Sequence, residues 1–225
     1  MINYKIVYSN RKTLGIYILK DGNVEIRCPK SVSKQTIDNF ISEKQEWINR
    51  MSVRNRDMFE QKNEFTLSIG SKLMFLGVEY PLTAASDNSY GFDGNSFYVP
   101  SALTSEQIKQ CIINLYKRLA NDVIKTKIAE IAPQMHTMPS AVKINSAKTR
   151  WGSCSGKNSL NFSWKLIMAD ERAVDYVIVH ELAHTFEHNH SSKFWNIVEK
   201  AMPDYRQRRS LLLDTQKKLA LENWD

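Results

Sequence analysis

The spacing of histidines constrains this chain more than any other feature of its sequence. Residues 180–190 read HELAHTFEHNH and hold four of the chain's five histidines. His180 and His184 bracket Glu181 in the pattern H-E-x-x-H. Positions i and i+4 of a helix project from the same face, about one turn apart. We therefore predict a helix here, with two imidazoles that can reach one metal ion.

The residues around this pattern indicate a buried helix with a catalytic carboxylate. The segment AVDYVIV (173–179) is apolar and compatible with a helix, and Asp170 is a suitable N-cap. Glu181 is offset from His180 by about 100° on such a helix. It is therefore not expected to be a third ligand, but it can accept a proton from a water on the metal. The pattern is typical of metallopeptidases.

A third histidine ligand must come from beyond these two, and the sequence offers two candidates. His188 lies eight residues after His180. On an unbroken helix this is about 12 Å, too far to share an ion unless the helix ends before it. His190 lies six residues after His184, the spacing found in H-E-x-x-H-x-x-G-x-x-H enzymes. We favour His190 as the third ligand.

This choice requires the chain to turn back without the usual glycine. Glu187 stands at the glycine position, so the turn must be made differently. Asn189 tolerates the left-handed conformation that ends many helices, and Ser191 or Ser192 can cap the next helix. Three histidines would hold one Zn²⁺ per chain and leave its fourth position to water. Cys154 is an alternative fourth ligand if the zinc is structural.

Composition and cysteine usage are typical of a globular cytoplasmic protein. Apolar residues make up 42% of the 225 residues, and no apolar run approaches the roughly 20 residues that span a bilayer. The start, MINYKIVYSN, has no apolar signal-peptide core. Cys28, Cys111 and Cys154 form no C-x-x-C pair. We therefore expect a cytoplasmic protein without disulfides and without a membrane segment.

The pattern along the chain predicts an α+β fold. A β-rich region with one helix is expected at 1–100, and a zincin-like catalytic region at 101–225. Ser33 would cap a single helix reaching Met51, and the polar segment 52–64 would extend that helix or form a linker. Thr104 and Gln107 form a capping box for a long helix ending near residue 131. Other predicted elements are strands at 4–9, 13–20 and 23–29, a hairpin of 148–154 with 159–166, and helices at 193–202 and 205–220.

The positive charge is concentrated in one stretch of the chain. No acidic residue occurs between Glu130 and Asp170, while the net charge of the whole chain is +7. The stretch 143–165 is either a solvated basic face or a surface for an acidic partner or nucleic acid. Its basic residues are Lys143, Lys148, Arg150, Lys157 and Lys165.

Several longer motifs carry a family resemblance. They are TRWGSCS (149–155), LNFSWKLIMA (160–169), DYVIVHELAH (175–184), NHSSKFW (189–195) and MPDYRQRR (202–209), joined by DGNVEIRCP and EKQEWI in the first third. In this order and spacing the chain resembles the YgjP-like metal-dependent hydrolases, distant relatives of the SprT-like and Spartan zinc proteases. The resemblance extends over nearly the whole chain. One departure is Asp170, where many relatives are expected to have proline.

The resemblance implies a zinc-peptidase fold with His180, His184 and His190 as ligands and Glu181 as catalytic base. It also implies that the hairpin 148–154/159–166 lies beside the metal helix and offers an edge strand to an extended substrate.

Four further residues are candidates for substrate binding, each with a structural alternative. Arg150 and Trp151 would line the cleft; alternatively Trp151 packs on the helix and Arg150 pairs with Asp175 or another carboxylate. Tyr205 and Arg206 are candidate donors to the oxyanion, or else surface residues.

The leading hypothesis is therefore a cytoplasmic zinc metallopeptidase, expected to be an endopeptidase that acts on protein or peptide substrates. One alternative is a DNA-associated protease that acts on protein–DNA adducts, although no zinc-finger pair or helix-turn-helix pattern is present. A second alternative is a non-catalytic module with a structural zinc.

Overall fold

The fold is α+β, as predicted, and its described residues, 2–224, form two compact units in the computed structural model. The first unit comprises the chain up to Phe65 together with Leu219–Asn223. The second comprises Thr66–Lys218 together with Trp224 and holds all the candidate site residues. The expected domain boundary at residue 100 stays a prediction.

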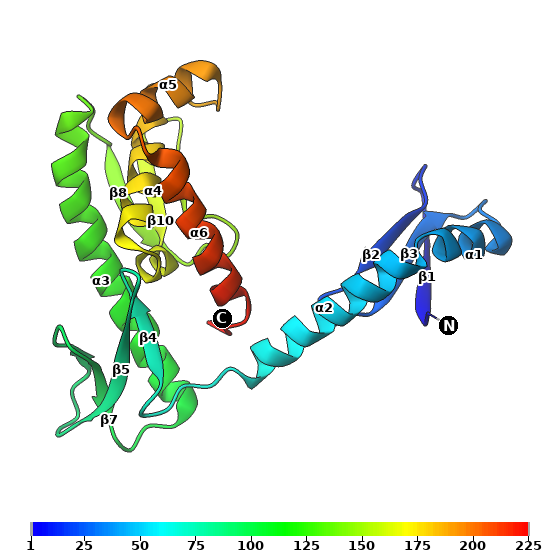
Figure 1. Ribbon diagram of the computed structural model, residues 1–225, viewed down its shortest axis with the longest axis horizontal. Coiled ribbons are helices and arrows are strands. Elements are labelled where there is room, and N and C mark those ends of the chain that lie inside the picture. Colours follow the sequence, from blue (N-terminus) through cyan, green and yellow to red (C-terminus); the bar gives the residue numbers. More distant parts are fainter. Residues whose placement is uncertain (1, 225) are drawn as a thin grey trace. The chain divides into compact units, whose positions relative to one another are not determined.

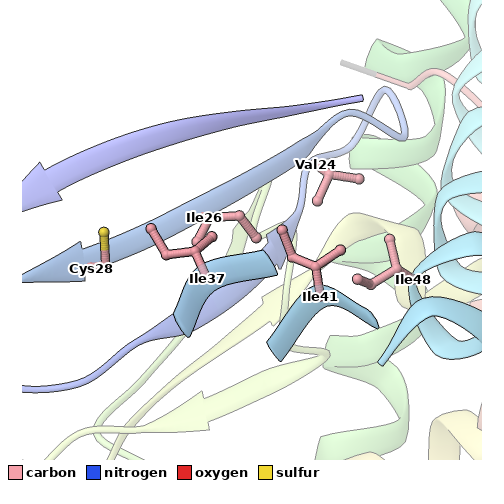
Figure 2. Close-up of a cluster of buried hydrophobic side chains, with 6 residues drawn as sticks. All are labelled: Val24, Ile26, Cys28, Ile37, Ile41 and Ile48. Carbon is pink, nitrogen blue, oxygen red and sulfur yellow. The ribbon is translucent and has the colours of Figure 1, made fainter. Parts of the chain in front are cut away.

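The first unit is a small sheet covered by one helix and the start of another. Alternate residues of the central strand point inward, and they meet isoleucines spaced along the helices (Figure 2). Ser33 caps the first helix by accepting a hydrogen bond from the Thr36 N–H. The elements are β1 (Tyr4–Ser9), β2 (Gly15–Ile18), β3 (Val24–Pro29), α1 (Lys34–Glu43) and α2 (Gln45–Glu64), with sheet order β1-β3-β2 (Figure 1).

The single helix expected after Ser33 is two helices. The chain breaks at Lys44, whose φ of −103° and ψ of 9° leave the helical region, and whose N–H donates to the Ile41 carbonyl. A bend of this kind lets Ile48 join the same apolar cluster as Ile41. The polar segment 52–64 continues as α2, so of the two alternatives the helix extension is confirmed.

The second unit begins with a four-stranded sheet and the long helix α3 (Ser105–Gln134). The capping box of Thr104 and Gln107 is present as predicted. The helix ends at Gln134, a few residues past the expected end near 131, and Pro133 lies inside its last turn. The strands are β4 (Lys72–Phe75), β5 (Val78–Ala85), β6 (Gly91–Phe92) and β7 (Phe97–Pro100), in the order β4-β5-β7-β6.

A second sheet of this unit lies next to the histidine helix. It contains β8 (Ala141–Asn145), β9 (Gly152–Cys154) and β10 (Ser159–Ser163), in the order β8-β10-β9, so β9 is an end strand. The predicted hairpin is confirmed over these shorter ranges. The expectation of strand over 164–166 is wrong, because Trp164–Met168 form a 3₁₀ helix, η1. Four of its five residues are buried, which a half-buried strand would not allow.

Three helices complete the unit: α4 (Glu171–Ala183), α5 (Ser192–Ala201) and α6 (Tyr205–Ala220) (Figure 1). An ion-pair network connects α4 to its neighbours. Asp175 of α4 contacts Lys127 of α3 at 2.8 Å and Arg208 of α6 at 3.5 Å. Asp175 therefore has partners other than Arg150, and the ion pair expected between these two is not formed.

Candidate metal centre

Helix α4 is buried along most of its length, as its apolar sequence predicted. Asp170 caps it by accepting a hydrogen bond from the Arg172 N–H at 2.9 Å. His180 lies in its last turn and His184 is the C-cap residue. Both imidazoles are therefore carried by backbone that packing holds in place.

The turn after α4 is made without glycine and without a left-handed residue. The N–H groups of Thr185 and Phe186 donate to Leu182 and Ala183, which closes two tight turns. Within the described chain, Asn189 is not among the residues with positive φ, so the turn does not use the left-handed conformation that this residue tolerates. The Asn189 side chain instead acts as a brace. It donates to the Glu187 carboxylate at 2.7 Å and accepts from the Ser191 N–H at 2.9 Å.

This turn brings three imidazoles together. His180, His184 and His190 each offer a ring nitrogen, and these nitrogens all lie within 4.8 Å of one another. Nε2 of His190 lies 3.0 Å from Nε2 of His180. Two imidazole nitrogens on one tetrahedral zinc are separated by about 3.3 Å, given zinc–nitrogen bonds of about 2.0 Å. His188 is exposed and lies outside this group.

The protonation of His184 suits metal binding. Its Nδ1 lies 2.9 Å from the carbonyl oxygen of Glu187. Because a carbonyl only accepts, Nδ1 carries the proton and the lone pair of Nε2 is left free. Glu187, which stands where enzymes of the H-E-x-x-H-x-x-G-x-x-H pattern have glycine, therefore has two roles. Its carbonyl orients His184, and its carboxylate holds Asn189.

The electrostatics of His180 also favour the ligand form. Burial, followed by the neighbouring His184 and His190, lowers the pKa of His180 from 6.5 to about 3. Burial likewise lowers the pKa of His184. Both rings are therefore neutral at neutral pH, as a metal ligand must be.

A buried ring forms the floor under all three histidines. Phe194 is fully buried, and its ring centroid lies 4.8 Å from that of His180, 4.4 Å from that of His184 and 4.8 Å from that of His190. Such packing limits the rotamers of the imidazoles. Phe194 lies on α5, and Ser191 caps this helix by accepting a hydrogen bond from the Phe194 N–H.

Glu181 is a buried carboxylate next to this group. It is 5% exposed, and its Oε2 has no hydrogen-bond partner among the described residues. Burial raises the pKa of Glu181 from 4.5 to about 7, against the lowering effect of Arg150. A buried and unpaired carboxylate is costly to stability, and such groups concentrate at functional sites.

Strand β9 lies directly over Glu181. A Cβ added to Gly152 would come within 2.7 Å of both Cγ and Oε1 of Glu181. Only glycine permits this close approach of the strand backbone to the carboxylate. The G of the RWGSC motif is therefore explained by contact with the helix rather than by a turn.

A cleft of about 320 Å³ opens in front of His180 and Glu181. Strand β9 and the residue before it form one wall, with Trp151 and Gly152, and α6 forms the other. Sequence reasoning missed three polar members of this cleft, Tyr176, Arg209 and Gln216. The full lining is Trp151, Gly152, Tyr176, Val177, His180, Glu181, Arg209, Leu212, Leu213 and Gln216.

The other predicted substrate-binding residues occupy different places. Arg150 is exposed and acts on Glu181 through its charge. Tyr205 is 5% exposed, and Arg206 lies over its ring and pairs with Glu199 at 3.4 Å. Tyr205 and Arg206 line a separate cavity of about 440 Å³. Arg209 lines both cavities, so the two adjoin at this residue.

Comparison with known proteins identifies the class of protein. The model of the YgjP-like metallopeptidase domain matches residues 12–215. One solved structure with similarity is the metallopeptidase zymogen abylysin of Pyrococcus abyssi, at 25% identity and a TM-score of 0.35, over 46% of this chain and 97% of the other. None of the curated proteins matches significantly. The chain thus belongs to the YgjP-like family and is a metal-dependent peptidase acting on protein or peptide substrates.

No helix within residues 2–224 has both the length and the apolar character needed to cross a membrane.

Proposed function

We propose that the chain is a zinc-dependent endopeptidase in which His180, His184 and His190 hold the metal and Glu181 is the general base. The convergence of three imidazoles on one point, two of them kept neutral by burial, beside a buried carboxylate, carries this proposal. Within the described residues the group has no fourth protein ligand such as Cys154. This favours a catalytic site over a structural zinc module, because structural zinc is usually held by four protein ligands.

The donor set fits zinc better than harder cations. Neutral imidazole nitrogens suit zinc, whereas magnesium and calcium prefer oxygen ligands. A bound zinc ion would supply Lewis acidity, lower the pKa of a water and polarise the substrate carbonyl.

Glu181 moves the proton in this scheme. With a pKa of about 7 in the metal-free protein, its carboxylate is close to the value at which a group both accepts and releases a proton at neutral pH. It accepts the proton of the attacking water and then gives it to the leaving amine. Its Oε2 is consistent with this role, because no group within residues 2–224 forms a hydrogen bond with that oxygen.

The edge of β9 is proposed to bind the substrate backbone. The N–H of Ser163 donates to the Trp151 carbonyl, and the N–H of Ser155 to the Ser159 carbonyl. Because alternate residues of an antiparallel pair direct their backbone groups at the partner strand, Gly152 and Cys154 direct theirs away from β10. An extended peptide added at this edge would lie against the cleft that contains Glu181.

The two adjoining cavities favour cleavage within a chain rather than at its end. One cavity contains His180 and Glu181, and the other contains Trp195, which stacks on His190. A substrate that occupied both cavities would have space for residues before and after the cut bond. Arg209 joins the two cavities and is the cation we propose to stabilise the oxyanion, in the role first expected of Tyr205 or Arg206.

The decisive experiment combines metal analysis with peptide-library cleavage by the purified chain, wild type against Glu181→Gln. We expect one zinc per chain in both proteins and a fall in kcat of about 10²–10⁴-fold in the variant. Cleavage at internal bonds would support the endopeptidase assignment. Equal activity in the two proteins, or a wild type that binds no metal, would refute the proposal.

The DNA-associated alternative and the cytoplasmic location remain predictions. Lys143, Arg150 and Lys157 of the basic stretch are exposed, as a phosphate-binding surface requires. Failure of the purified chain to bind DNA at low ionic strength would exclude this alternative.

A further inference from the structure

The third histidine differs from the other two in how it is held. His190 is exposed and belongs to the connection between α4 and α5, whereas His180 and His184 are carried by α4. An exposed side chain on a connecting segment loses rotamer freedom when it binds a ligand. Phe194 packs edge-on against His190 from the core, and a second neighbouring group must restrict the exposed imidazole further if it is to contribute fully to a metal site.

Trp195 has the geometry to do this. Its ring stacks on that of His190, with centroids 5.9 Å apart and planes 30° apart. It also meets His180 edge-on, with centroids 5.8 Å apart. Trp195 therefore contacts both histidines whose Nε2 atoms lie 3.0 Å from each other.

Trp195 also stacks on a buried tyrosine, which in turn stacks on a second one. Tyr205 stacks on Trp195 at 5.5 Å and 22°, and Tyr176 stacks on Tyr205 at 6.4 Å and 19°. Both tyrosines are 5% exposed. The result is a series of rings, each stacked on the next, that begins on α4, passes through α6 and α5, and ends on His190. A series anchored in the core can hold an exposed imidazole where an isolated tryptophan would not.

We propose that Trp195, stacked on Tyr205, is a positioning residue that fixes the orientation of His190 for metal binding. The inference rests on the proposed function, since it takes His190 to be a metal ligand. Trp195 does not touch the metal itself in this account. It reduces the loss of side-chain freedom on metal binding, as groups outside the ligand shell do in other metal sites.

The test measures zinc affinity of the full chain by competition with a chromophoric chelator, independently of activity. Trp195→Ala is expected to weaken zinc binding by about 10–100-fold, the range seen when outer-shell partners of metal ligands are removed. Trp195→Phe keeps a flat ring and is expected to restore binding to within about 3-fold of wild type. Phe186→Ala is the matched control, because Phe186 is an exposed ring on the same connection and should leave affinity unchanged.

A double-mutant cycle separates positioning from a general effect on the fold. If Trp195 acts through His190, Trp195→Ala should cost less than about 3-fold in a His190→Ala background. An equal cost in both backgrounds, or no cost in the wild-type background, would overturn the inference. Circular dichroism of the metal-free variants checks that each is folded. Zinc binding by the wild type reports on the proposed function, so failure of the metal site is distinguished from failure of the positioning role.

Discussion

Helix α4 and the connection that follows it supply the same chemical group by different means. On α4, His180 and His184 are placed by helical spacing and by burial of the surrounding helix. On the connection, His190 is placed by the hydrogen bonds of the neighbouring Asn189 side chain and by ring packing against Phe194 and Trp195. A helix fixes two ligands through its backbone, whereas an exposed turn must fix its ligand through individual contacts. Substitutions on α4 and on the connection should therefore change zinc affinity and stability by different amounts.

The largest difference is expected when the ligands themselves are removed. Zinc sites in small proteins bind with about 10–16 kcal/mol over four ligands, or roughly 10²–10³-fold in affinity per ligand. We expect His184→Ala to lose about 10³-fold in zinc affinity, because its ring is 8% exposed and already oriented by Glu187. His190→Ala should lose about 10²-fold, because ordering an exposed ring offsets part of its contribution.

Chelator competition measures both values, and His188→Ala is the control, since His188 lies outside the histidine group. Equal losses at positions 184 and 190 would contradict the distinction between helix and connection. A loss for His188→Ala as large as for His190→Ala would show that the third ligand is wrongly assigned.

The second effect concerns the stability of the metal-free protein and its dependence on pH. Burial raises the pKa of Glu181 from 4.5 to about 7. Between pH 4.5 and pH 7, therefore, Glu181 is protonated in the folded protein and ionised in the unfolded chain. Ionisation of Glu181 therefore destabilises the fold progressively as the pH rises from 4.5 to 7, by at most about 3 kcal/mol. Glu181→Gln removes this cost.

Above pH 7 the metal-free variant should consequently unfold at higher denaturant concentration than the wild type, and the difference should disappear near pH 4.5. The low pKa of His180 is common to both proteins and cancels in the comparison. Urea unfolding in the presence of a chelator, at several pH values, measures the difference. A difference that does not vary with pH would mean that Glu181 titrates normally in the fold.

Local rules explain which parts of the structure the sequence predicted. The caps at Ser33, Thr104 and Asp170 and the burial of α4 depend on residues a few positions apart, and all four expectations are confirmed. The alternation of Leu160 and Phe162 also predicted β10 correctly.

The failures occur where distant residues decide the outcome. The alternating pattern continues through Trp164, but burial on all sides there favours a 3₁₀ turn. Asp175 pairs with Lys127 and Arg208 rather than with Arg150 because α3 and α6 pack against α4. Arg209 was missed for a similar reason: its place in the cleft depends on how α6 packs, which no local pattern reports.

The third effect tests how closely β9 must approach the helix. Gly152→Ala would place a methyl group within 2.7 Å of the Glu181 side chain. Overpacking of this kind costs about 1–3 kcal/mol, and displacement of the general base should lower kcat by at least about 10-fold. Gly156→Ala in the same hairpin is the control, since nothing lies within 4 Å of its added Cβ. If both variants keep wild-type stability and activity, the contact between Gly152 and Glu181 is not needed.

The smallest effect is expected from the brace on the connection. Asn189→Ala removes the hydrogen bond donated to Glu187 and the one accepted from Ser191, each exposed to solvent. Solvent-exposed hydrogen bonds contribute about 1 kcal/mol or less, so global stability should change by no more than about 1 kcal/mol. Zinc affinity should fall by up to about 10-fold, a larger effect than the one on stability. Asn189 directly precedes the ligand His190, whereas the folding of α4 does not depend on Asn189.

Thermal unfolding of the metal-free protein and chelator competition together test this last expectation. Glu187→Gln is the matched control, because its side-chain oxygen can still accept from Asn189 and its carbonyl can still orient His184. A large loss of stability with unchanged zinc affinity would place the role of Asn189 in the fold rather than in the metal site. Since α4 orders its two histidines without Asn189, such a result would also mean that the connection is rigid for reasons other than its own hydrogen bonds.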